Sequence, residues 1–408
     1  MSIKNKNKRV DLHQNGDLSN AEQGLKTILP LRVTIILALT VFLTSLSFSF
    51  TVAGLTNAVI AVSWAACVLC AVVMFMTSKR FSHAVWKTIA LALSLSLFGY
   101  PIIPALLFGS IISVGAFSSL ICSANKQRAL IPILLPVLSY AVSLAVTSDP
   151  LLSLAALILY LPAIPLGLTS RRGVSMISSV LSSAAVFFGI SAGFVALILY
   201  AYYGSVSVDA ANALIDDYTE LFIYYSEQSF AQLGYTELDE AIKKELILSI
   251  DAYVNAAVGI TMAICACVAY AALKLQHNLF SAYGLDAYLS PKATTLKISV
   301  AASVIFAVAH VMSFALDSTN RMSITAVVCA NICIALAPGL ALMGIQAIKA
   351  LPRRFGIKGV FIAIALVAAV ILLFIASPLL LPLVGAIYVI MGAIDLWAKD
   401  FYGKGENQ

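Results

Sequence analysis

The chain has 408 residues, of which 61% are hydrophobic and only 11% are charged. A soluble domain is about 45–50% apolar and about 25% charged, so no soluble core could bury this much apolar surface. The net charge is +6, and the basic residues lie in short clusters between apolar runs. This distribution argues against a nucleic-acid partner, which would require a basic stripe interleaved with aromatic residues.

The apolar runs are long and continuous, without the period-two alternation of a barrel. Because a helix satisfies its own backbone hydrogen bonds in lipid, they predict an all-α, polytopic transmembrane helix bundle. A span needs about 20 apolar residues, and we expect ten to twelve spans, with the hairpins at 88–122 and 359–397 leaving the count open. The candidate spans are 31–54, 56–77, 88–105, 106–122, 129–147, 150–169, 174–203, 252–273, 298–317, 322–348, 359–377 and 379–397.

The predicted organisation has five parts, and the basic residues orient them. All lysines and arginines except Lys243, Lys244 and Arg321 fall on one side of this topology. Such a bias predicts a multi-pass protein of a bacterial cell (plasma) membrane, with both termini in the cytoplasm. The parts are a disordered basic cytoplasmic tail (1–30), an N-terminal transmembrane bundle (31–203), an acidic amphipathic extracytoplasmic segment (204–251), a C-terminal transmembrane bundle (252–397) and a cytoplasmic tail (398–408).

The segment 204–251 differs from the rest because its acidic residues far outnumber its lysines. Apolar residues recur at helical spacing over 214–225 and again over 238–253. This pattern predicts two amphipathic helices that lie on the outer membrane surface or over the bundle. A lid over a cavity and a plain solvated linker are the alternatives.

Polar groups at membrane depth are costly, so the few that occur there are the candidate ligand-binding residues. They are His310 in the span 298–317, Asn331 in the span 322–348 and Asn255 near the start of the span 252–273. His310 could titrate near neutral pH or bind a ligand, or it could hydrogen-bond a neighbouring helix. An intramembrane asparagine such as Asn331 also commonly joins two helices.

The chain carries no H-E-x-x-H and no G-x-x-x-x-G-K-[ST] sequence, the motifs that would indicate a metalloprotease or an ATPase. Its G-x-S-x-G, Gly189-Ile190-Ser191-Ala192-Gly193, lies inside the apolar run 174–203 and not at the strand-to-helix turn that a serine hydrolase requires. We therefore predict that it is not an enzyme and has no catalytic residues, metal site or cofactor. Cys67 and Cys70 form a C-x-x-C without a nearby His or carboxylate, which favours apolar packing over redox or metal chemistry. Gly189 and Gly193 form a G-x-x-x-G, which favours close helix packing within the chain.

Two short stretches in the second half carry a family resemblance. One is Gln276-His277-Asn278-Leu279-Phe280-Ser281-Ala282-Tyr283-Gly284-Leu285, which leads to Pro291, and the other is Gly392-Ala393-Ile394-Asp395-Leu396-Trp397. On these residues the chain resembles the YybS-like family of uncharacterised bacterial multi-pass membrane proteins, which is distantly similar to substrate-binding subunits of energy-coupling-factor transporters. The resemblance implies that the bundle binds a small molecule and works with other membrane subunits, including an ATPase.

These observations favour an integral membrane protein that serves as a small-molecule transport component of the substrate-binding type, with the lipid bilayer and a ligand of unknown identity as its partners. A non-transporting membrane scaffold or regulatory protein is the alternative. A transporter should hold a cavity lined by groups such as His310 and Asn331. A scaffold should instead have a filled bundle and an exposed face.

Overall fold

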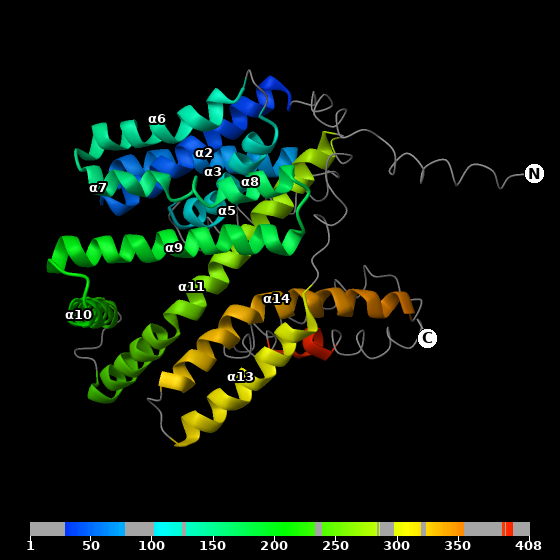
Figure 1. Ribbon diagram of the computed structural model, residues 1–408. Coiled ribbons are helices and arrows are strands. Elements are labelled where there is room, and N and C mark those ends of the chain that lie inside the picture. Colours follow the sequence, from blue (N-terminus) through cyan, green and yellow to red (C-terminus); the bar gives the residue numbers. More distant parts are fainter. Residues whose placement is uncertain are drawn as a thin grey trace, which may run out of the picture. The chain divides into compact units, whose positions relative to one another are not determined.

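The computed structural model describes residues 29–77, 102–124, 128–232, 239–283, 285, 298–319, 324–354, 386–387 and 389–394, and every regular element within these ranges is helical (Figure 1). The predicted all-α class is therefore confirmed. Six helices are long and apolar enough to cross a membrane, which makes the chain a multi-pass integral membrane protein by length and composition. They are Leu31–Val52, Asn57–Met76, Leu130–Thr147, Met176–Tyr203, Glu240–Ala282 and Ile324–Gln346.

Several predicted features fall outside the described residues. These are the tail 1–30 up to residue 28, the tail 398–408, the span 88–105 up to residue 101, the span 359–377 and most of the span 379–397. Two shorter apolar helices, Phe108–Cys122 and Val300–Ser313, also occur within the described part of the chain. Ten to twelve spans thus remain a prediction.

The chain packs as two compact units, one formed by residues 1–183 and 268–295, the other by residues 184–267 and 296–408. We refer to them as unit 1 and unit 2. Two helices, α9 (Met176–Tyr203) and α11 (Glu240–Ala282), contribute residues to both units.

Helix α2 (Leu31–Val52) lies at the centre of unit 1 and packs against α3 (Thr56–Met76), α5 (Ile102–Cys122) and α6 (Leu130–Thr147). Gly54, with a φ of +70°, makes the turn between α2 and α3, a backbone conformation that glycine adopts without steric cost. The interior of unit 1 contains many buried serine and threonine side chains beside its apolar residues. Some of these hydroxyl groups donate to carbonyl oxygens of their own helix, as Thr40 and Thr44 do. Others bond between helices, which small side chains allow to approach closely.

A set of such bonds, which we call the hydroxyl seam, joins α2 to three later parts of the chain. The Ser47 and Ser63 hydroxyls lie 2.6 Å apart, and those of Ser49 and Ser143 lie 2.5 Å apart. The Tyr160 hydroxyl lies 2.6 Å from that of Ser139 and accepts a longer bond of 3.4 Å from Ser45. All seven side chains of the seam are buried: Ser45, Ser47, Ser49, Ser63, Ser139, Ser143 and Tyr160.

The predicted span 150–169 is wrong as a single helix. The chain instead forms a four-residue α7 (Pro150–Ser153), a 3₁₀ turn η3 (Leu154–Leu157) and a short α8 (Ala163–Arg171). The Asp149 side chain caps α7 by accepting from the backbone N–H groups of residues 151 and 152. Irregular backbone can lie at membrane depth when protein surrounds it, and here Leu159, Tyr160 and Leu166 are all buried.

Unit 2 contains α10 (Val208–Gln232), the first part of α11, α13 (Val300–Thr319) and α14 (Ile324–Arg354). Helix α10 confirms the first predicted amphipathic helix. The second is not separate, because residues 240–253 are the beginning of α11, which continues through the predicted span 252–273. With 43 residues, α11 is about 65 Å long, roughly twice the thickness of the hydrocarbon core.

One ion pair joins α10 to the start of α11. The Lys243 ammonium lies 2.9 Å from a Glu227 carboxylate oxygen and 3.5 Å from one of Glu240. The hydrogen bond with Glu227, and then its negative charge, raise the pKa of Lys243 above its usual value. Because the Lys243 and Glu227 side chains are still partly in contact with water, the pair fixes the geometry of the α10–α11 connection more than it stabilises the fold.

Candidate ligand-binding site

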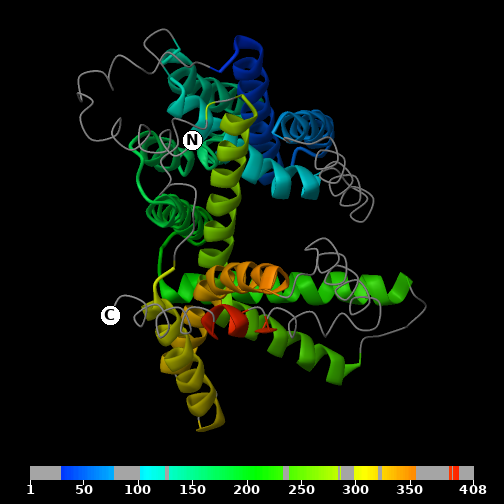
Figure 2. The same ribbon diagram turned by 90° about the vertical axis from the view of Figure 1, so that its right-hand side faces the viewer.

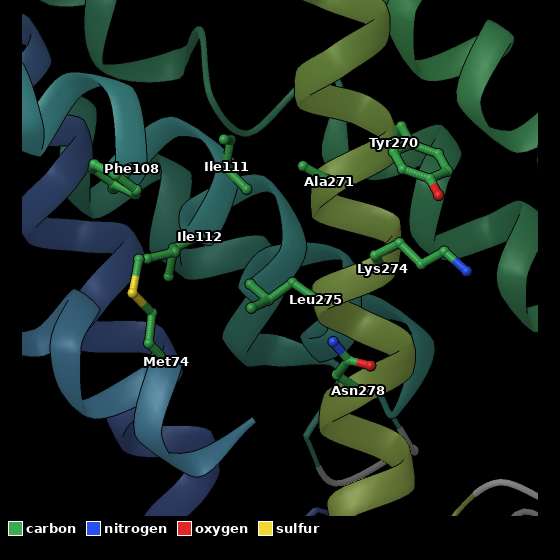
Figure 3. Close-up of a pocket in the computed structure, with 9 residues that line it drawn as sticks. All are labelled: Met74, Phe108, Ile111, Ile112, Tyr270, Ala271, Lys274, Leu275 and Asn278. Carbon is green, nitrogen blue, oxygen red and sulfur yellow. The ribbon is translucent and has the colours of Figure 1, made fainter. Parts of the chain in front are cut away.

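A pocket of about 410 Å³ lies within unit 1, between α3 and α5 on one side and the last part of α11 on the other (Figure 3). Ligand pockets commonly enclose about 300–1,000 Å³, so this volume suits a small molecule. The pocket is lined by Met74 of α3, by Phe108, Ile111 and Ile112 of α5, and by Tyr270, Ala271, Lys274, Leu275 and Asn278 of α11.

A close contact between α5 and α11 sets one end of this pocket. A Cβ atom on Gly115 would lie 2.8 Å from the carbonyl oxygen of Ala272 and 2.8 Å from the Leu275 side chain. The two helices can therefore approach only because residue 115 is a glycine. One turn earlier on α5 the large side chains of Ile111 and Ile112 replace the glycine, and the pocket opens there.

The walls of the pocket are apolar and its polar groups come from α11. Figure 3 shows Leu275 pointing from α11 towards Ile112 and Met74, whereas Lys274 extends from the other side of the helix. The Lys274 ammonium lies 5.9 Å from the centre of the Tyr270 ring, a cation–π distance. Among the described lining residues, Lys274 carries the single formal charge. The arrangement suits a mostly apolar molecule whose polar end reaches the α11 rim.

The structure brings two of the three predicted ligand-binding residues together, in unit 2. Asn331 of α14 accepts a hydrogen bond from the Gly259 backbone N–H through Oδ1 and donates through Nδ2 to the Asn255 carbonyl oxygen at 2.6 Å. In an unbroken α-helix the N–H of residue 259 would pair with the C=O of residue 255. The Asn331 amide therefore bridges two groups of the α11 ladder, and we call this contact the amide joint.

The amide joint depends on a second close approach. A Cβ atom on Gly259 would lie 2.7 Å from the Asn331 carbonyl oxygen and 2.8 Å from its Cα atom. Asn331 Nδ2 also donates to the Val327 carbonyl oxygen at 2.8 Å. Its amide is thus engaged in hydrogen bonds within and between helices, and a ligand-binding role for Asn331 and Asn255 stays a prediction.

His310 lies apart from the amide joint on α13, where its imidazole is exposed and stacks on Phe306 with the ring centres 5.9 Å apart. No contact given for the described residues joins it to Asn255 or Asn331. Its proposed role in ligand binding is likewise a prediction. Among the residues that the structure describes, a Cβ atom at Gly189 or Gly193 would meet nothing within 4 Å, so the close packing predicted for this G-x-x-x-G is not seen there.

The pocket residues were missed by the sequence analysis, which searched only for polar groups at membrane depth. One signal was available: Tyr270, Lys274 and Asn278 recur every four residues and give the end of α11 one polar edge. The apolar wall has no comparable signal. Comparisons of the chain with family models, curated proteins and solved structures gave no match.

Proposed function

We propose that this integral membrane protein binds a small, mostly apolar molecule in the pocket between α3, α5 and α11, as a substrate-binding component of a membrane transport system. The pocket carries the proposal: its volume of about 410 Å³ and its apolar walls, with Lys274 and Asn278 at the rim, fit a molecule with one polar end. The resemblance to the YybS-like family supports the same reading.

The proposed topology places both termini in the cytoplasm of a bacterial-type cell, where basic clusters such as Lys349, Arg353 and Arg354 would lie. An ATPase would be a separate subunit, because the chain carries no nucleotide-binding loop of its own. Binding and transport are therefore separable, and each has its own readout.

Native mass spectrometry of the gently solubilised full chain tests the binding step. The wild-type protein should carry an added small-molecule mass. The variant Ala271→Phe should lose this mass, because Ala271 lines the pocket and a phenyl ring would occupy the space. Ala257→Phe is the matched control, since Ala257 is an exposed position earlier on the same helix, and it should keep the bound molecule.

The same spectra test the transport assignment through co-purifying subunits. An ATPase that accompanies the wild-type protein would support a transport component. A ligand-free protein attached to another membrane or envelope protein would instead favour the scaffold. Equal retention of the molecule by Ala271→Phe and Ala257→Phe would show that the molecule binds elsewhere.

A further inference from the structure

Helix α10 carries an unusual exposed surface. Tyr218, Leu221, Phe222 and Tyr225 recur at positions i, i+3, i+4 and i+7, so they share one side of the helix. Within the described part of the chain all four side chains are exposed, Tyr218 to 64% and Phe222 to 51%. We call these four residues the aromatic stripe. An apolar stripe of this size is unfavourable in contact with water, so an apolar partner is expected to cover it.

The carboxylates of α10 lie on the opposite side. Asp209, Asp216, Glu220 and Glu227 are separated by seven, four and seven residues, spacings that return to the same face of an α-helix. On a third side, between these two, Asp217 accepts a hydrogen bond of 2.6 Å from the Tyr203 hydroxyl. On the carboxylate side, Glu227 pairs with Lys243 of α11. These two contacts, with α9 and α11, fix the rotation of α10 about its own axis.

The position of α10 follows from the end of α9. That helix has 28 residues, about 42 Å, which is enough to cross the bilayer. Tyr200 and Tyr202, near its end, are 65% and 77% exposed, as expected where a span meets the headgroups. Gly204, with a φ of +71°, then ends the helix, and α10 begins four residues later.

The direction of α10 is that of a helix lying in the membrane plane. Figure 1 shows α9 lengthwise and α10 end-on, and Figure 2 shows α10 lengthwise, so the two helices run crosswise. A helix perpendicular to a span lies parallel to the bilayer surface. Since Asp217 bonds to the end of α9, the aromatic stripe and the carboxylates occupy the two flanking sides of α10.

From these observations we infer that α10 is an interfacial helix whose aromatic stripe is buried in the headgroup region of the bilayer, with its carboxylates in water. The partner is the lipid surface itself. Tyrosine and phenylalanine are residues that membrane interfaces favour, and the membrane is already present at the end of α9. The acidic face would be repelled by anionic lipid, so the attachment is apolar rather than electrostatic.

Hydroxyl-radical footprinting of the full chain in phosphatidylcholine vesicles tests this inference, and Tyr224 provides an internal control. Tyr224 adjoins Tyr225 and is similarly exposed in the protein alone, 53% against 58%. Its position lies about 100° around the helix from that of Tyr225, and the two rings meet edge to face with their centres 5.7 Å apart. Tyr218 and Tyr225 should be oxidised several-fold less than Tyr224, and high ionic strength should not remove this protection. Equal oxidation of Tyr224 and Tyr225 would overturn the inference.

A pair of variants sharpens the test. Phe222→Lys places a charge within the stripe and should raise the oxidation of Tyr218 and Tyr225 towards that of Tyr224. Glu220→Lys makes a charge change on the opposite face and should leave the protection in place. If the stripe is unprotected in pure lipid vesicles but protected in native membranes, a protein covers it and the lipid assignment is wrong.

Discussion

The two units of the protein hold their helices together in different ways. In unit 1 the hydroxyl seam distributes its bonds over α2, α3, α6 and the irregular segment around Tyr160. In unit 2 the amide joint concentrates its bonds on one side chain, Asn331, inserted against one glycine. Lipid offers no hydrophobic drive between helices, so packing and polar bonds carry the association. A distributed seam should lose stability gradually on mutation, whereas a concentrated joint should lose much of it at once.

The largest effect is expected at the glycine of the amide joint. Gly259→Ala would place a Cβ atom 2.7 Å from the backbone of Asn331, so α11 and α14 would have to separate, at a cost of about 2–3 kcal/mol. Thermal unfolding in detergent, followed by circular dichroism, measures this loss. Gly189→Ala is the control, because nothing lies within 4 Å of its Cβ position, and it should be neutral or slightly stabilising.

An intermediate effect is expected for Asn331→Ala. The variant removes the two Asn331 bonds to α11 but leaves the Gly259 N–H and the Asn255 C=O inside a continuous helix, so the loss should be about 1 kcal/mol. The same unfolding experiment measures it. Native mass spectrometry adds a second readout: if Asn331 only joins helices, retention of the bound molecule should not change. Loss of the molecule from this stable variant would favour the ligand-binding role predicted from the sequence.

The smallest effect is expected in the hydroxyl seam. Ser47→Ala and Ser63→Ala should each cost about 0.5–1 kcal/mol, because each leaves one buried hydroxyl without its partner. The double variant should cost less than the sum of the two, since it removes both polar groups together. A double-mutant cycle of unfolding free energies measures this coupling. A double variant that costs much more than the sum would mean that the seam is not distributed.

The sequence predicted well those helices whose apolar run could only be a membrane-spanning helix. The apolar runs at 31–54, 56–77, 129–147 and 174–203 each correspond to one helix with ends within two residues of the prediction. The run at 150–169 has a similar composition but contains Pro162 and Pro165 and packs inside unit 1. Composition cannot separate a span from a buried irregular segment, so this prediction failed. The prediction also divided α11 into an amphipathic helix and a separate span, although no proline or glycine interrupts residues 240–258.

The pocket could not be predicted in the same way. Its walls bring Met74, Ile112 and Leu275 together from distant parts of the chain, and ordinary apolar residues give no local sign of which neighbour they will face. The register of α5 against α11 depends on the close approach at Gly115. This glycine is visible in the sequence, but its partner is not. Asn331 was found because a polar group in an apolar run is conspicuous, although its contacts are with helices.

The hydroxyl bonds of α2 also have a consequence for the order in which the protein is made. Thr40, Thr44 and Thr51 donate to carbonyl oxygens four residues earlier in their own helix, so α2 can enter the bilayer with these groups already satisfied. Ser47 finds its partner in the next helix. Ser49 must wait for Ser143, which is synthesised 94 residues later. Until α6 is synthesised, the Ser49 hydroxyl of a nascent chain therefore lacks its Ser143 partner. We expect that a chain released before that point would be recognised and degraded by membrane proteases.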